Sequence, residues 1–283
     1  MKRILYIVFA LFLICACDKQ NNDLNQIRFN IGFPATKATS TAFEAGDELS
    51  LYAVEYEDGM QMPLQIGGNY LNNEKVVYDG NDWAGARTLY WSDKPCDFYA
   101  LYPYQAEITS VDQYPFSVAQ DQNGTGYEAS DLLFAKVENV AQSAGVVDLH
   151  FKHMMSKCVV EVVKGATFEG VIPDDIVCHI YNTCTSCKVD CVAGTLEKDP
   201  FGAKKTITMN KLSNTRFEAV VVPQNIENRT PLIELTMGGI AYLLDYSLSF
   251  RPGYVHTITV NVNTSPDQEM IEISIDPGID DWN

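Results

Sequence analysis

Four cysteines crowd into one short segment, residues 178–191, and closely spaced thiolates are typical ligands of zinc and of iron–sulfur clusters. A structural zinc site usually contains two Cys-x-x-Cys pairs, whereas this segment contains one, Cys184/Cys187. The alternation in Cys187-Lys188-Val189-Asp190-Cys191 is typical of a strand, which would place the two cysteines on one face about 13 Å apart. That separation is too long for a shared ion or a disulfide. The pattern therefore favours buried thiols that pack as small apolar side chains.

Two alternatives for the cysteines stay open. Of the eight cysteines in the chain, Cys15 and Cys17 belong to the N-terminal segment described below. The other six could form one or more disulfides in an exported protein, or could bind a metal. These six are Cys96, Cys158, Cys178, Cys184, Cys187 and Cys191. Their redox state and pairing do not follow from the sequence.

Histidines and acidic loops give no firmer sign of a reactive site. His150 and His153 would share a face of a helix, but the neighbouring alternation indicates a strand, in which they point to opposite faces. The loop 121–126 begins like a calcium-binding EF-hand loop, yet its twelfth position is Leu132 rather than Glu. The sequence has no nucleophile elbow, zinc-protease motif, phosphate loop or dinucleotide fingerprint. We therefore expect no metal, no cofactor and no enzymatic activity.

The first 17 residues have the three parts of a bacterial lipoprotein signal. Lys2 and Arg3 are followed by an apolar run of 11 residues, and Ile14-Cys15-Ala16-Cys17 then matches a lipobox. A membrane-spanning helix needs about 20 apolar residues, so this run is too short to be one. We expect residues 1–17 to be a lipoprotein signal peptide, Cys17 to be acylated, and residues 18–26 to be a polar tether.

Beyond the tether, the elements that must position any site are β-strands. Apolar and polar residues alternate with a period of two in residues 27–33, 147–152 and 254–262, which indicates strands with one buried face. Turn dipeptides such as Asp58-Gly59 and Gly238-Gly239 lie between such runs. There is no sustained helical period. The sequence therefore predicts an all-β protein built from sandwiches or barrels.

Length and charge limit the organisation and the partners. A chain of 283 residues is long enough for about two domains. The small, polar residues 138–145 lie between an aromatic-rich half and a valine-rich half, so we expect an N-terminal β-sandwich at residues 27–145 and a C-terminal one at 146–283. The formal charge of −17 argues against nucleic acid as a partner, because phosphates require a basic surface.

Seven groups of short motifs follow one another along nearly the whole chain, each occurring once. They are the lipobox at Cys17; Thr36-Lys37-Ala38 with Phe43-Glu44-Ala45-Gly46-Asp47-Glu48-Leu49-Ser50-Leu51-Tyr52; Leu89-Tyr90-Trp91 with Phe98-Tyr99-Ala100-Leu101-Tyr102-Pro103; Asp131-Leu132-Leu133-Phe134-Ala135; Leu149-His150-Phe151-Lys152-His153-Met154-Met155-Ser156-Lys157; Pro252-Gly253-Tyr254; and Ile279-Asp280-Asp281-Trp282. By their order and spacing, the chain resembles the fimbrillin family of lipoprotein pilins from Gram-negative anaerobes.

The resemblance implies two transthyretin-like β-sandwiches in tandem and a place in surface fimbriae on the outer membrane. In polymerising members of the family, a protease cuts after a basic residue and the first strand leaves. The open groove then accepts an extended strand from another fimbrial subunit, a form of β-strand addition. The partners implied are therefore other fimbrial subunits, the outer membrane through the lipid anchor, and a host or bacterial surface ligand.

Carried onto this chain, the resemblance places the functional residues at its two ends. The cut would follow Lys37, with Arg28 as the alternative, and the donor strand would lie in residues 270–275, close to Trp282. The apolar residues of the removable strand are Ile27, Phe29, Ile31 and Phe33, and those of the donor strand are Ile271, Ile273 and Ile275.

The alternative is a non-polymerising outer-membrane lipoprotein that binds a glycan or a host ligand. Several aromatic side chains could stack on sugar rings, although half of them must face the core wherever that region is a strand. They are Trp83, Tyr90, Trp91, Tyr99, Tyr102 and Tyr104.

Overall fold

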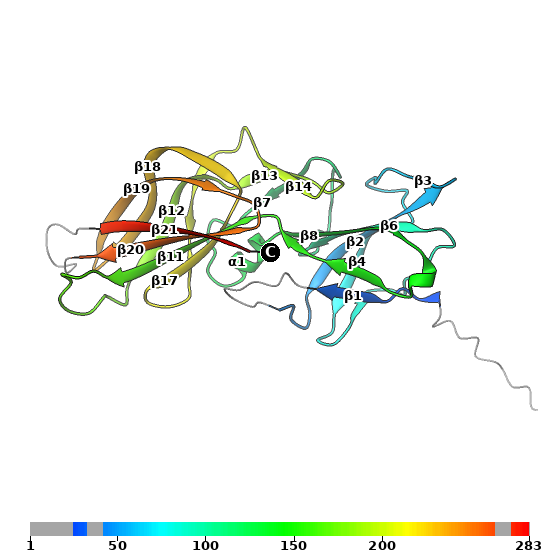
Figure 1. Cartoon of the computed structure of the whole chain (residues 1–283), viewed down its shortest axis with the longest axis horizontal. Coiled ribbons are helices and arrows are strands. Elements are labelled where there is room, and N and C mark those ends of the chain that lie inside the picture. Colours follow the sequence, from blue (N-terminus) through cyan, green and yellow to red (C-terminus); the bar gives the residue numbers. More distant parts are fainter. Residues whose placement is uncertain (1–24, 33–41, 264–272, 283) are drawn as a thin grey trace, which may run out of the picture.

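The computed structural model describes residues 25–32, 42–263 and 273–282, which form an elongated fold made almost entirely of β-strands (Figure 1). The prediction of an all-β protein is confirmed. Within these residues the two helical elements are short: the α-helix α1 (Thr125–Ser130) and the 3-10 helix η2 (Gln142–Ala144). In the part of the chain that the structure describes, no helix is long and apolar enough to cross a membrane.

Within the described residues, the N-terminal half contributes ten strands. They are β1 (Phe29–Gly32), β2 (Glu48–Glu57), β3 (Met60–Gln61), β4 (Leu71–Tyr78), β5 (Trp83–Gly85), β6 (Cys96–Tyr102), β7 (Tyr114–Ser117), β8 (Leu133–Val140), β9 (Val147–His150) and β10 (Lys152–His153). Seven of them form a sheet in the order β10-β8-β6-β2-β4-β5, with β3 attached to β2. β1 and β9 form a separate two-stranded sheet.

The described part of the C-terminal half contributes eleven strands. They are β11 (Ser156–Lys164), β12 (Val177–Cys184), β13 (Ser186–Asp190), β14 (Thr195–Lys198), β15 (Lys204–Thr208), β16 (Asn210–Lys211), β17 (Arg216–Val221), β18 (Gln224–Met237), β19 (Ile240–Phe250), β20 (Tyr254–Val262) and β21 (Ile273–Asp281). A five-stranded sheet has the order β16-β17-β11-β20-β21, and a four-stranded sheet has the order β15-β12-β18-β19. The hairpin β13–β14 pairs with β7 in a three-stranded sheet.

Strand β2 is buried on both faces and therefore borders two hydrophobic cores. Because side chains alternate along a strand, Leu49, Leu51 and Ala53 face one core, and Tyr52 and Val54 face the other. The first, called here the small core, lies between the seven-stranded sheet and β1–β9. The small core consists of Ile27, Leu49, Leu51, Ala53, Leu71, Val76, Trp83, Leu89, Trp91, Cys96, Phe98, Ala100, Leu133, Ala135, Val147, Leu149 and Phe151.

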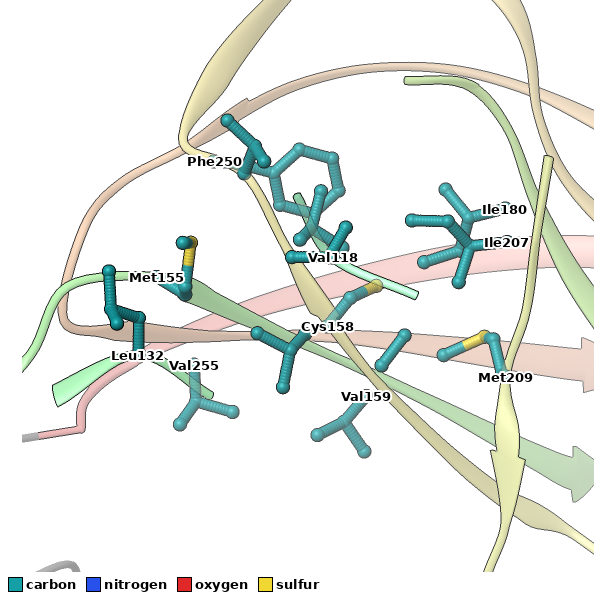
Figure 2. Packing of buried hydrophobic residues seen from close by; sticks show 14 of the residues in the cluster. Val118, Leu132, Met155, Cys158, Val159, Ile180, Ile207, Met209, Phe250 and Val255 are labelled. Atoms are coloured by element: carbon teal, nitrogen blue, oxygen red, sulfur yellow. The ribbon is translucent and has the colours of Figure 1, made fainter. Parts of the chain in front are cut away.

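The second core, called here the large core, fills the C-terminal half and extends under the seven-stranded sheet. Figure 2 shows the part around Cys158, where strands of the C-terminal sheets converge. Residues of the large core labelled there are Val118, Leu132, Met155, Cys158, Val159, Ile180, Ile207, Met209, Phe250 and Val255. Val-rich strands suit this position because β-branched side chains pack well on a pleated surface.

Two of the predicted turn dipeptides form tight hairpins. Asp58 and Gly59 join β2 to β3 with φ angles of 49° and 77°, and Gly238 and Gly239 join β18 to β19 with φ angles of 57° and 79°. Positive φ at both central residues matches the twist of the flanking strands, which is why Asp-Gly and Gly-Gly occur there. These local signals are sufficient to set the register of each hairpin.

Strand pairing crosses the boundary that the composition predicts near residue 145. β9 and β10 follow that point in the chain, yet they pair with β1 and β8. β7 precedes it, yet it pairs with β13. The division into sandwiches at residues 27–145 and 146–283 stays a prediction, and the sheets are the units that position the candidate site.

Candidate functional site at the two terminal strands

Strand β1 is held to the rest of the chain along one side. It pairs in parallel with β9, from Phe29 opposite Val147 to Gly32 opposite His150. Just before β1, the amide of Ile27 donates to the carbonyl of Leu89 over 2.9 Å. β1 therefore belongs to a small two-stranded sheet that lies over the small core.

The side chains of β1 alternate as the sequence predicts. Ile27 is buried, while Phe29 and Ile31 are half-buried against the small core. Arg28 and Asn30 are exposed, and the Asn30 amide donates to the Asp148 carboxylate over 2.8 Å. Phe33 lies outside the described residues. The three described apolar residues pack against the small core. Release of the strand that carries them stays a prediction.

A cavity of about 300 Å³ adjoins β1. Phe29 and Ile31 line it together with Phe43 and Trp83. Phe43 is held by edge-to-face contacts with Trp83 and Phe151, with ring centroids 4.9 and 5.9 Å apart. An aromatic cluster therefore lies where the chain re-enters the described structure after β1.

The two expected cut sites differ in what cleavage would release. Lys37 lies outside the described residues, on the C-terminal side of β1. Arg28 lies on the N-terminal side, and its carbonyl oxygen accepts a hydrogen bond from the Val147 amide over 2.8 Å. Cleavage after Arg28 leaves β1 attached to the chain, whereas cleavage after Lys37 separates β1 from it.

Strand β21 contains two of the three expected donor residues and is paired within its own chain. Ile273 lies opposite Val262 and Ile275 lies opposite Val260 in an antiparallel ladder with β20. Ile271 lies outside the described residues. The ladder continues to Asp281, so nine residues of β21 are paired. β21 forms one edge of the five-stranded sheet, and in Figure 1 it runs beside β20.

The residue after β21, Trp282, is buried and fixes the end of this strand. Its amide donates to the carbonyl of Gly253 over 2.8 Å. Its ring stacks on the imidazole of His153, with centroids 3.8 Å apart and planes 10° from parallel. His153 Nδ1 lies 2.8 Å from a carboxylate oxygen of Asp131, and the Lys157 ammonium lies 5.8 Å from the Trp282 ring. Sequence reasoning missed this arrangement, since 129 residues of chain separate His153 from Trp282.

A buried ion-pair network supports the same region. Lys157 Nζ lies 2.6 Å from a carboxylate oxygen of Glu218, and both side chains are almost fully buried. Arg216 bonds the other oxygen of Glu218 over 2.9 Å and also pairs with Glu161. The Tyr127 hydroxyl donates to Glu218, and burial raises the pKa of Tyr127 well above its usual value. A buried pair of this kind is costly to break because one charge is left uncompensated.

The six cysteines are all free and buried, as the packing interpretation predicts. Burial raises the pKa of Cys158, Cys187 and Cys191 to about 12 each, so these thiols stay protonated. Cys158 lies among apolar neighbours in Figure 2. Within the described residues, no group of three or more histidine, cysteine or acidic side chains is placed to hold a metal ion.

The aromatic residues named for sugar stacking are divided between the cores and the surface. Trp83, Trp91 and Tyr99 are buried in the two cores, and Tyr102 is half-buried. Tyr90 is the exposed member of that set. Three of the six rings are thus buried, in line with the expectation for strands, and sugar binding by the others stays a prediction.

The family follows from comparison with known proteins. A family model described as fimbrillin-like matches residues 36–282, and the chain belongs to this family. A Bacteroides ovatus protein named "Putative fimbrium tip subunit Fim1C" is 28% identical over 138 residues, which cover 43% of this chain and 24% of that protein. The chain therefore matches only a minor part of that relative's length. The family model and the relative both describe fimbrial proteins, which supports a fimbrial location for this chain.

Two crystal structures, each of a "putative cell adhesion protein", have a similar fold. The Bacteroides uniformis protein has a TM-score of 0.69 at 20% identity, and the match covers 91% of this chain and 99% of that one. The Bacteroides ovatus protein has a TM-score of 0.68 at 15% identity, and the match covers 91% and 98%. At these identities the likeness shows the fold.

Proposed function

We propose that this chain is a structural fimbrial subunit that accepts an extended strand from another subunit once proteolysis has released β1. The observation that carries the proposal is the position of β1. It covers apolar residues of the small core, yet it is held by a four-residue parallel pairing with β9. The role is structural and adhesive, and the proposal includes no catalysis.

Loss of β1 would leave two features that an incoming strand can use. The edge of β9 would present unpaired backbone N–H and C=O groups, which are costly to leave without partners and bind an extended chain readily. The places of Ile27, Phe29 and Ile31 would become apolar pockets at alternate positions. Backbone hydrogen bonds would then give strength, and the pockets would select the incoming sequence.

In this proposal Lys37 is the effective cut site. Cleavage there would detach β1 together with the tether, whereas cleavage after Arg28 would leave β1 paired with β9. We further propose that Cys17 is acylated and anchors the unprocessed subunit to the outer membrane, so that cleavage at Lys37 would also release the subunit from its lipid.

Residues 270–275, with Ile271, Ile273 and Ile275, remain the proposed donor strand. To donate, β21 would have to leave its ladder with β20 and withdraw Trp282 from beside His153. We therefore propose that acceptance at the β1 position comes first, and that donation by this chain requires a separate opening step.

A disulfide between β1 and β9 tests the proposal. Asn30 and Asp148 are opposite each other and exposed, so the double variant N30C/D148C should form a bond without disturbing the cores. After limited trypsin cleavage, the unmodified protein should lose the fragment that contains β1 and bind a labelled peptide of residues 25–33. The stapled protein should keep the fragment and bind no peptide until dithiothreitol is added.

The single variants N30C and D148C are the matched controls, and each should behave like the unmodified protein. Intact mass identifies the cut bond in every sample. Peptide binding by the oxidised staple, or failure of the cleaved unmodified protein to release its first strand, would contradict the proposal.

A further inference from the structure

One aromatic side chain is held in solvent by a fixed turn. Phe201, in the loop between β14 and β15, is 96% exposed. Its amide donates to the Asp199 carboxylate over 3.0 Å, and the Asp199 amide donates to the carbonyl of Ser186 over 3.0 Å. Pro200 precedes Phe201 and limits the backbone further. Rigid aromatic side chains supply contact area at a low cost in conformational entropy in known binding surfaces.

The exposed ring borders a cavity of about 440 Å³, a size that accommodates a small ligand. Residues of the β13–β14 hairpin line the cavity, among them Lys188, Asp190 and Glu197. Lys188 lies opposite Glu197, and Asp190 lies opposite Thr195, while Cys187 and Val189 face the large core. The sheet thus has one apolar face and one face rich in hydrogen-bonding groups.

The polar lining has both donors and acceptors. Lys188 and Glu197 form no ion pair with each other or with any other described residue, although they are cross-strand neighbours. Asp112 and Gln113 reach the cavity from the loop before β7. Asp112 is fixed by the Ser110 hydroxyl, which donates to it over 2.6 Å. Groups that are fixed in this way can meet a ligand with little loss of conformational freedom.

We propose that this cavity binds a neutral saccharide, with Phe201 stacked on the sugar ring. The face of an aromatic ring is electronegative and packs well against polarised C–H groups, and carboxylates accept strong hydrogen bonds from hydroxyls. Asp112, Asp190, Glu197 and Asp199 give the lining four carboxylates against the one ammonium of Lys188. That charge balance disfavours sialylated and other anionic sugars.

No residue of β1 lines this cavity, so sugar binding there does not require strand exchange. Binding to a panel of neutral oligosaccharides (lactose, N-acetyllactosamine and mannobiose), with sialyllactose as the anionic probe, can be measured by calorimetry on the uncleaved chain. We expect at least one neutral sugar to bind and sialyllactose not to bind. Phe201→Ala should weaken the affinity about tenfold or more, since aromatic anchors carry much of such binding.

Val171→Ala is the matched control, because Val171 is 85% exposed in a loop that does not line the cavity. It should change the affinity by less than about twofold. Glu197→Gln, which keeps the shape of the side chain, should weaken neutral-sugar binding and leave the fold unchanged by circular dichroism. Absence of binding by every neutral sugar, or binding that Phe201→Ala leaves intact, would overturn the inference. Either result would leave the staple experiment unaffected, so the two proposals fail separately.

Discussion

The strands at the two ends of the described chain are both edge strands, yet they are held very differently. β1 has four residues, pairs in parallel with β9, and places Phe29 and Ile31 half-buried against the small core. β21 has nine residues, pairs antiparallel with β20, and is followed by the buried Trp282. The two strands therefore differ in the number of paired residues and in the burial of one aromatic ring.

The difference follows from general energetics. A fully buried large apolar side chain stabilises a fold by about 1.5–3 kcal/mol, and partial burial contributes correspondingly less. Antiparallel pairing is also slightly more stable per residue than parallel pairing. Fewer stabilising contacts would therefore be lost if β1 left its place than if β21 did. How firmly an edge strand is held thus depends on the side chain that anchors its end as well as on its backbone hydrogen bonds.

The largest expected effect is that of Trp282→Ala on the anchoring of β21. Removing the ring leaves a cavity beside His153, and such truncations cost about 3–5 kcal/mol. Urea unfolding should show this loss in the free energy of unfolding. Ile279→Ala, at an exposed position of the same strand, should cost less than about 0.5 kcal/mol. A loss below about 1 kcal/mol for Trp282→Ala would mean that the ladder alone holds β21.

A smaller effect is expected at β1. Phe29 is half-buried, so Phe29→Ala should lower the free energy of unfolding by about 1–2 kcal/mol, less than a fully buried ring would. The same variant should speed the loss of the β1 fragment after cleavage at Lys37, measured by intact mass over time. Arg28→Ala, at the exposed preceding position, is the control. If Phe29→Ala were as destabilising as Trp282→Ala, the contrast between the two strands would fail.

A further effect concerns pH and the sheet that carries β21. His256 of β20 is buried, and this burial, with the nearby Arg251, lowers its pKa to about 4 from an ordinary value of 6.5. Between those values the unfolded state binds more protons, so this contribution is complete above pH 6.5 and falls as the pH drops towards 4. The stability of the unmodified protein should therefore decline over this window more steeply than that of His256→Gln.

The matched control for this comparison is His150→Gln. His150 lies in β9, beside β1, and its side chain is 74% exposed. Urea unfolding at several pH values should give the same slope for His150→Gln as for the unmodified protein. Equal slopes for His256→Gln and the unmodified protein would show that His256 does not contribute to acid unfolding.

Much of the local structure could be predicted from residue order. The period of two in residues 27–31 places Ile27 and Ile31 towards the core and Arg28 outwards, as observed. The dipeptides Asp58-Gly59 and Gly238-Gly239 specify their hairpins because both positions require positive φ. Alternation along the cysteine segment likewise indicates burial of Cys187 without a ligand role.

The sequence by itself determined the strand content and the faces that are buried, because each depends on neighbours a few residues apart. It also determined the family, through the order of short motifs along the chain. Only the tertiary structure decided that β1 lies beside β9, that Trp282 stacks on His153, and that Phe201 stands exposed beside Lys188 and Glu197. A period of two says which side chains face inwards, but it does not say which distant strand lies opposite. That choice depends on the packing of the whole chain, since many strands of similar pattern could occupy each place.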